Sequence, residues 1–182
     1  MYAEFIRRQR RNIGIPLVLI SLYLVRFVAP YLWISLAFVV TGEAIRIWAA
    51  GHLHKEQILT TGGPYRMIRN PLYLGSFLIA IGFCGIAGSN WVWILMIGYF
   101  LLCYIPVIRY EEGILRKKFG ATFTNYAAAV PAFYPSLPLY PQSSTTFSWQ
   151  QVIRNKEYNA VIGIIVIYLL LFLKSYFGVL SV

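Results

Sequence analysis

The sequence predicts an all-α membrane protein, a polytopic helix bundle with five transmembrane helices, and three observations support this fold class. The 182 residues have a mean hydropathy of +0.64, and only 12% of them are charged, well below the share in soluble domains. Five apolar runs are each close to the roughly 17 to 25 residues that cross a bilayer as a helix. Basic residues gather at alternate ends of these runs. The runs cover about residues 13–29, 31–50, 71–87, 91–109 and 158–180.

The first four runs form two predicted hairpins. A turn at Pro30 joins the first pair, and the stretch GIAGSNW at 85–91 joins the second. Short turns of this kind make consecutive helices antiparallel neighbours. Gly75, Gly82 and Gly85 offer small surfaces in the third run, and small residues let helices approach closely in lipid. We therefore expect the third helix to pack tightly against a neighbour.

Basic residues set the predicted orientation. The formal net charge is +10, and Lys and Arg lie before the first run, between the second and third, and between the fourth and fifth. The two short turns carry no charge. By the positive-inside rule the N-terminus and both long connections are cytoplasmic and the C-terminus is outside. The basic excess therefore indicates topology and attraction to anionic membrane lipid, and we expect no nucleic-acid partner.

The polar connections predict the domain organisation. Residues 109–131 show an amphipathic pattern, typical of a helix that lies at the membrane interface. Residues 131–149 contain four prolines and a Ser/Thr cluster, which favour an extended segment. We predict a membrane core at 1–137, a cytoplasmic linker at 138–157 and an appended transmembrane helix at 158–182.

Polar residues converge where the second, third and fourth predicted helices reach the cytoplasmic side. Because the hairpins are short, these ends should meet and form a pocket with both charge signs and aromatic walls. In an alternative interpretation the arginines anchor lipid headgroups and the glutamates pair with them, and composition leaves both open. The residues are His52, His54, Lys55, Tyr65, Arg66, Arg69, Asn70, Tyr73, Glu111 and Glu112.

Two ionisable residues lie inside the second run. Glu43 and Arg46 are three residues apart, a spacing that places them on one face of a helix. Charges within a membrane span are costly and need partners. The pair either locks the bundle together or lines a polar cavity, and the sequence leaves both open.

The sequence lacks the motifs of soluble enzymes. No strand pattern leads into G-x-G-x-x-G, no P-loop occurs, and no Ser-His-Asp or Cys-His arrangement stands out. Cys84 and Cys103 fall within apolar runs, where packed thiols are expected. His52 and His54 would point in different directions on a helix, so we predict no metal site. Any cofactor must be held by the membrane helices and their cytoplasmic ends.

Three segments carry a more specific pattern. They read RIWAAGHLHK (46–55), LTTGGPYRMIRNPLYLGSFLIAIGF (59–83) and EEGILRKKFGATFTNYAAAVPAFYP (111–135). In order and spacing, over about residues 40–137, they resemble the isoprenylcysteine carboxyl methyltransferase family and its phospholipid methyltransferase relatives. The resemblance implies a cytoplasmic pocket for S-adenosylmethionine without a Rossmann domain. It also implies a lipophilic acceptor, a prenylcysteine-like carboxylate or a lipid, that arrives from the bilayer.

The resemblance assigns roles by position. Arg69 and Glu112 are the predicted catalytic residues, with Arg69 holding an anionic group of the acceptor. Asn70 stands where many relatives carry histidine, and Asn does not titrate near neutrality, so it excludes a general base there. Ala132 stands where relatives often place arginine, which points to different acceptor recognition. The predicted cofactor-binding residues are His52, Tyr65, Arg66, Asn70, Tyr73 and Glu111.

Two other functions fit the same helices. Sterol reductases look similar in helix arrangement, so a membrane reductase that uses NADPH on a sterol- or isoprenoid-like substrate is one alternative. A non-enzymatic lipid-binding or scaffold protein is the other. The scaffold hypothesis predicts that Arg69→Ala and Glu112→Ala change no activity. Binding of S-adenosylmethionine without competition from NADPH would favour the methyltransferase.

Overall fold

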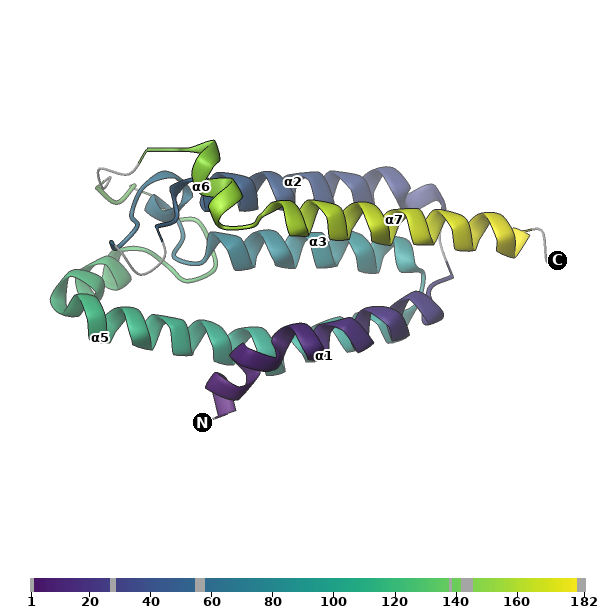
Figure 1. Ribbon diagram of the computed structural model, residues 1–182, viewed down its shortest axis with the longest axis horizontal. Coiled ribbons are helices and arrows are strands. Elements are labelled where there is room, and N and C mark those ends of the chain that lie inside the picture. Colours follow the sequence, from purple (N-terminus) through teal and green to yellow (C-terminus); the bar gives the residue numbers. More distant parts are fainter. Residues whose placement is uncertain (1, 27–28, 55–57, 138, 142–145, 180–182) are drawn as a thin grey trace.

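Helices dominate the computed structural model of the chain (Figure 1). The structure describes residues 2–26, 29–54, 58–137, 139–141 and 146–179, and no strand occurs among them, which confirms the predicted all-α class. The α-helices are α1 (Tyr2–Leu24), α2 (Leu32–His52), α3 (Pro71–Ala87), α4 (Asn90–Tyr99), α5 (Ile105–Ala129), α6 (Trp149–Arg154) and α7 (Tyr158–Val179).

Each predicted apolar run falls on a helix, but only some of these helices have the dimensions of a membrane span. Three helical stretches are long and apolar enough to cross a bilayer: Leu32–His52, Asn90–Ala129 and Tyr158–Phe177. The apolar part of α1, Asn12–Leu24, and helix α3 are shorter. Of the five predicted spans, the structure therefore supports three as membrane-spanning by length and composition and gives the other two as shorter apolar helices.

Helices α4 and α5 form one continuous helical stretch. A π-helical turn at Phe100–Tyr104 joins them, and the part from Asn90 to Phe119, before the kink at Gly120, rises about 45 Å. That length exceeds the roughly 30 Å hydrocarbon core of a bilayer, so part of the stretch extends beyond it. The separate interfacial helix expected after residue 109 is therefore a continuation of the fourth span, with a kink at Gly120, whose φ is 52°.

The closest helix contact in the bundle is between α2 and α3, which run antiparallel. A Cβ atom added to Gly42 would lie 2.6 Å from the carbonyl oxygen of Gly75, and one added to Gly82 would lie 2.7 Å from that of Ser35. Only glycine permits these backbones to come so near. The prediction of tight packing is confirmed for Gly75 and Gly82, whereas Gly85 faces open space.

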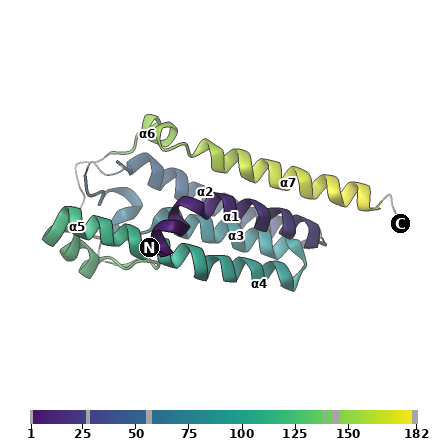
Figure 2. The same cartoon turned by 60° about the horizontal axis from the view of Figure 1, so that its bottom comes forward.

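The remaining helices enclose a space against this pair. In Figure 1, α2, α3 and α7 lie above α1 and α5, and in Figure 2 α4 runs along the opposite edge of the bundle from α7. At one end an apolar cluster that includes Val25, Phe83, Ile86, Val92 and Leu171 closes the space. At the other end the polar connections meet.

The described residues that follow α5 are hydrogen-bonded to the loop before α3. Residues 131–140 form backbone hydrogen bonds with the loop before α3, among them Ser136 N to Met67 O at 3.0 Å and Tyr140 N to Arg66 O at 3.1 Å. The predicted linker at 138–157 contains the short helix α6, and its residues 138 and 142–145 lie outside the described part. The described residues between α5 and α6 form no helix, and their hydrogen bonds to the loop before α3 show that this part is not a free tether.

Alanine substitutions at two different glycines test the α2–α3 contact. Gly42→Ala introduces a Cβ that the facing backbone cannot avoid, so we expect a loss of about 1 to 3 kcal/mol and a lower Tm in detergent. Gly85→Ala is the matched control, because its Cβ meets open space and alanine favours helix by up to about 1 kcal/mol. Equal Tm values for the two variants would contradict this packing.

Candidate functional site

An ion pair lies at the centre of the polar end of the bundle. Arg69 precedes α3, and its Nε donates to Glu112 Oε1 of α5 at 3.0 Å, while its Nη2 donates to Oε2 at 3.4 Å. Nη1 donates to the carbonyl oxygens of Ala127 and Val130 at 2.5 and 2.9 Å. The side chains of Arg69 and Glu112 are 15% and 18% exposed. All three guanidinium nitrogens are therefore committed to protein acceptors.

Asn70 extends this network. It ends the loop and precedes Pro71, whose missing N–H costs nothing in the first turn of a helix. Asn70 Nδ2 donates to Glu112 Oε1 at 2.9 Å and to the carbonyl oxygen of Ala132 at 3.3 Å. Glu112 thus accepts hydrogen bonds from two consecutive residues of the loop and fixes the start of α3 against α5.

One turn further along α3, Tyr73 meets the other glutamate. Its hydroxyl donates to Glu111 Oε2 at 3.0 Å. Glu111 forms no ion pair with a side chain that the structure describes. Since both Tyr73 and Glu111 line the large cavity described below, this pair presents a carboxylate to the interior of the bundle.

Three other predicted site residues contact the loop between α2 and α3 or the segments packed against it. Tyr65 is buried, its carbonyl oxygen accepts the Tyr126 hydroxyl at 2.8 Å, and burial raises the pKa of the Tyr65 phenol. Arg66 Nε donates to the carbonyl oxygen of Tyr140 at 2.8 Å. His52 is buried at the end of α2 and its ring lies against Gly63. None of these three lines the large cavity.

Two further residues of the predicted convergence lie at the same end of α2. His54 Nδ1 is 3.0 Å from the carbonyl oxygen of His52, so its ring folds back on the helix end. Lys55 lies outside the described residues. Among the described residues, no group of three or more His, Cys, Asp or Glu side chains is placed to hold a metal ion.

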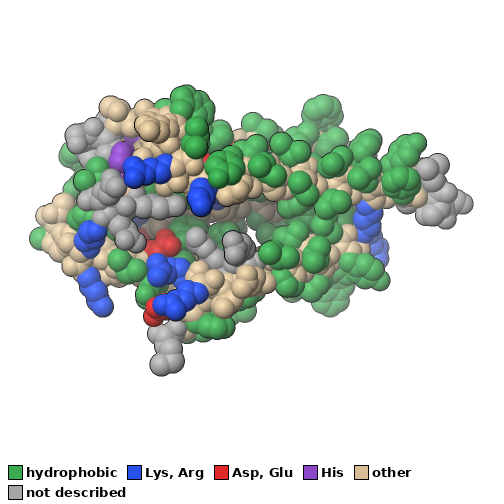
Figure 3. Space-filling model, in the orientation of Figure 1, with side chains coloured by type: hydrophobic (Ala, Val, Ile, Leu, Met, Phe, Trp, Pro, Cys, Tyr) green, Lys and Arg blue, Asp and Glu red, His purple; other side chains and the backbone are tan. Residues whose placement is uncertain are grey.

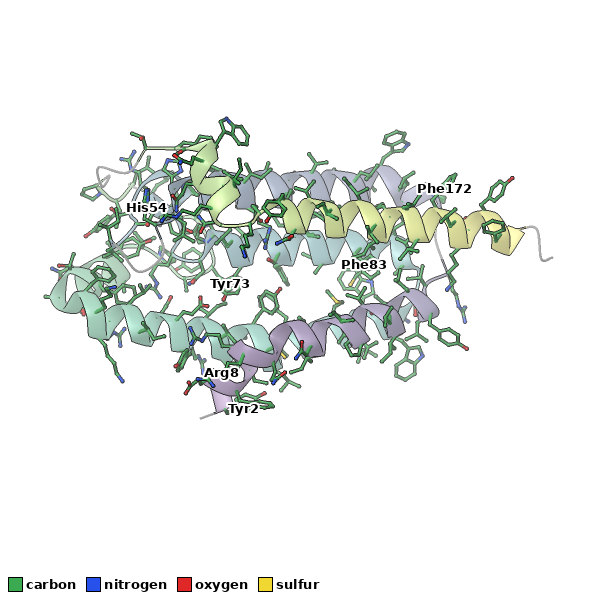
Figure 4. The ribbon with its side chains drawn as sticks, viewed as in Figure 1. Tyr2, Arg8, His54, Tyr73, Phe83 and Phe172 are labelled. Carbon is green, nitrogen blue, oxygen red and sulfur yellow. The ribbon has the colours of Figure 1, made fainter. Side chains whose placement is uncertain are left out.

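A cavity of about 1150 Å³ opens between α1, α3, α5 and the start of α7. Its walls change in character along its length. Charged and polar side chains line one end, and apolar residues of α1 such as Ile15, Val18 and Leu19 line the other. In Figure 3, charged side chains gather mainly at the end of the molecule near α5 and α6, and Figure 4 shows Tyr73 between α3 and the helices below it. The cavity suits an amphipathic ligand.

A second, apolar pocket of about 80 Å³ adjoins this cavity between α3 and α4. Phe77, Ile81 and Trp93 line it, and it shares the side chains of Ser76 and Met96 with the cavity. The π-helical turn at Phe100–Tyr104 forms part of its wall, and such turns often occur at functional sites.

The cavity wall also contains charges that the sequence only partly predicted. Arg46 lines the cavity and also contacts Ser76 of α3, whereas Glu43 pairs with Arg46 within α2 and does not line the cavity. Arg46 Nη2 lies 2.6 Å from Glu157 Oε1, immediately before α7. Glu157 was not a predicted site residue. The one available signal is that it is the only acidic residue after Glu112.

The chain resembles known proteins over a region that includes part of the cavity wall. The family model described as phospholipid methyltransferase matches residues 13–122. A nickel-cobalt-cadmium resistance protein, NccN, of Alcaligenes xylosoxydans xylosoxydans is 33% identical over 75% of this chain and 70% of its own length. No solved structure matches significantly.

Two further relatives match a shorter region. A cobalt-zinc-cadmium resistance protein, CzcN, of Cupriavidus metallidurans is 37% identical over 55% of this chain and 47% of its own length. A protein-S-isoprenylcysteine O-methyltransferase of Schizosaccharomyces pombe is 31% identical over 57% of this chain and 44% of its own length. The chain therefore spans less than half the length of these two.

The two adjacent glutamates should respond differently to the same change. Glu112→Gln leaves the buried Arg69 guanidinium without a counter-charge, so we expect a loss of about 3 kcal/mol in stability and a clear fall in Tm. Glu111→Gln keeps an acceptor for the Tyr73 hydroxyl and removes a charge that has no described ionic partner, so its Tm should stay close to wild type. Thermal melting in detergent measures both, and a larger fall for Glu111→Gln would contradict the assignment.

Proposed function

The chain belongs to the phospholipid methyltransferase family, and from this premise we propose that it transfers a methyl group from S-adenosylmethionine to a lipophilic acceptor in the membrane. The isoprenylcysteine methyltransferase relative supports a membrane methyltransferase. The observation that carries the proposal is the Glu111–Tyr73 pair, a carboxylate on the wall of a cavity large enough for donor and acceptor together.

The residues at the cavity suit a cationic donor. S-adenosylmethionine supplies an activated methyl group on a positively charged sulfur and carries an ammonium group as well. Glu111 would hold one of these positive groups, because charge-assisted hydrogen bonds and ion pairs are strongest in a site with little water. Tyr73 fixes the orientation of the Glu111 carboxylate through its hydroxyl.

The acceptor would enter from the lipid. Ile15 and Leu19 line the cavity yet remain exposed, so the cavity is open on the side of α1. An acyl or isoprenoid chain could lie along this apolar wall and in the pocket between α3 and α4, with its polar end toward Glu111. A prenylcysteine-like carboxylate and a lipid headgroup both satisfy this arrangement.

The contribution of the protein to the rate would be positioning. Holding donor and acceptor in line for displacement is worth up to roughly 7 to 11 kcal/mol in well-oriented reactions. Because the nitrogens of Arg69 already donate within the protein, we propose that Arg69 and Glu112 act by fixing Asn70, Tyr73 and Glu111 in place. His52, Tyr65 and Arg66 would support the same loop.

The orientation in the membrane follows from the charges. Arg7, Arg8 and Lys156 line the polar end of the cavity, close to Glu111 and the other basic connections. By the positive-inside rule this end is cytoplasmic, where the soluble donor is available. The C-terminal end of α7 would then lie outside.

Direct binding tests this function against its alternatives. Purified protein in detergent should retain labelled S-adenosylmethionine, and excess NADPH should not displace it, whereas a reductase would show the opposite pattern. Glu111→Gln should weaken donor binding about tenfold, the effect of losing one charge-assisted contact. Lys117→Gln, an exposed position of α5 that does not line the cavity, is the control and should bind as wild type does. Failure of the wild-type protein to bind the donor would exclude the proposal.

A further inference from the structure

A charged cluster lies in the cavity wall across from the Glu111 side. It consists of Glu43 and Arg46 of α2 and Glu157 at the start of α7. Arg46 Nε is 3.5 Å from Glu43 Oε2, and its Nη2 is 2.6 Å from Glu157 Oε1. Arg46 also contacts the Ser76 hydroxyl of α3. Arg46 and Glu157 line the cavity, and Glu157 lies outside the region that the family model matches.

The ion pair is not needed to attach this C-terminal segment. Asn155 Nδ2 donates to the carbonyl oxygens of Ala50 and Leu53 at 2.8 and 2.9 Å, and Gln151 Nε2 donates to Leu53 O at 2.5 Å. The Leu53 carbonyl, just beyond the end of α2, accepts two of these bonds, and the Ala50 carbonyl accepts the third in addition to the backbone N–H of Leu53. The segment is therefore anchored to α2 by neutral contacts, and the charge of Glu157 requires a separate explanation.

The cluster sets two acidic side chains against one guanidinium. Glu43 and Glu157 are only 9% and 6% exposed. Among the described residues, Arg46 is the one ionic partner of both: it lies 2.6 Å from Glu157 Oε1 and 3.5 Å from Glu43 Oε2, and neither contact has the geometry of a hydrogen bond. Lys156 also lines the cavity, but it is exposed, so water screens its charge. Buried charge without full compensation is costly and marks ligand or ion pathways in membrane proteins.

We propose that the Glu43–Arg46–Glu157 cluster binds a positively charged group of the methyl donor, so that the C-terminal segment is part of the donor site. The inference rests on the proposed function. S-adenosylmethionine carries two positive groups, the sulfonium and the ammonium, and the cavity has two acidic positions on different elements, Glu111 and this cluster. Each acidic position takes one positive group. Glu157 borders the cavity and contacts the donor, whereas Glu43 contributes through its charge.

Three ligands that share the adenosine part distinguish two effects of a substitution, a loss of charge recognition and a general weakening of the cavity. S-adenosylmethionine has both positive groups, S-adenosylhomocysteine keeps only the ammonium, and 5′-methylthioadenosine has neither. Glu157→Gln should weaken binding of S-adenosylmethionine about tenfold and leave binding of 5′-methylthioadenosine within about twofold of wild type. The affinity for S-adenosylhomocysteine identifies the group: a matching loss indicates the ammonium, and no loss indicates the sulfonium.

A second variant guards against a folding defect. Glu43→Gln removes the other acidic side chain of the cluster without touching the cavity surface, and it should shift the preference between S-adenosylmethionine and 5′-methylthioadenosine in the same direction. Unchanged binding of S-adenosylmethionine in both variants, or equal weakening of all three probes, would overturn the inference. If the wild-type protein binds S-adenosylmethionine and the variants do too, only this inference fails. If the wild-type protein does not bind it, the proposed function fails.

Discussion

The partly buried ion pair between Arg69 and Glu112 is the constraint on which the candidate site depends. In the described residues of the loop between α2 and α3, the one regular element is a short 3-10 turn at Gly63–Arg66, so regular backbone bonds give this part little support. The ion pair fastens the end of this loop to α5, and the carbonyl groups of Ala127 and Val130 accept hydrogen bonds from Nη1 of the guanidinium. A pair this well satisfied can offset the cost of removing two charges from water. Tyr73 and Glu111 then meet as a consequence.

The glycine contact between α2 and α3 provides the rigid frame for that loop. Because these two helices are in backbone contact, their polar ends have a fixed separation, and Arg46 of α2 can reach Ser76 of α3. The helices α1, α5 and α7 stand off from this pair and leave the cavity between them. Tight packing at one place thus creates the free space beside it.

The sequence predicted the helices and the partners at the polar end for a clear reason. Apolar runs of near-bilayer length have few alternatives to helix, and the short hairpins predicted that Arg69, Asn70 and Tyr73 meet Glu111 and Glu112. The sequence could not predict which of these residues face the cavity. That distinction depends on the register of α5, which pairs Glu112 with Arg69 and places Glu111 on the cavity wall. Glu157 escaped notice because its contact with Arg46 joins residues more than a hundred positions apart.

The methyl donor should bind at one location, and photolabelling measures that location directly. A photoreactive analogue of S-adenosylmethionine, cross-linked to the purified protein and mapped by mass spectrometry, should modify peptides from the start of α3, the start of α5 and the segment around Glu157. Unmodified S-adenosylmethionine in excess should prevent the reaction. Saturable labelling confined to peptides that do not line the cavity would contradict the account.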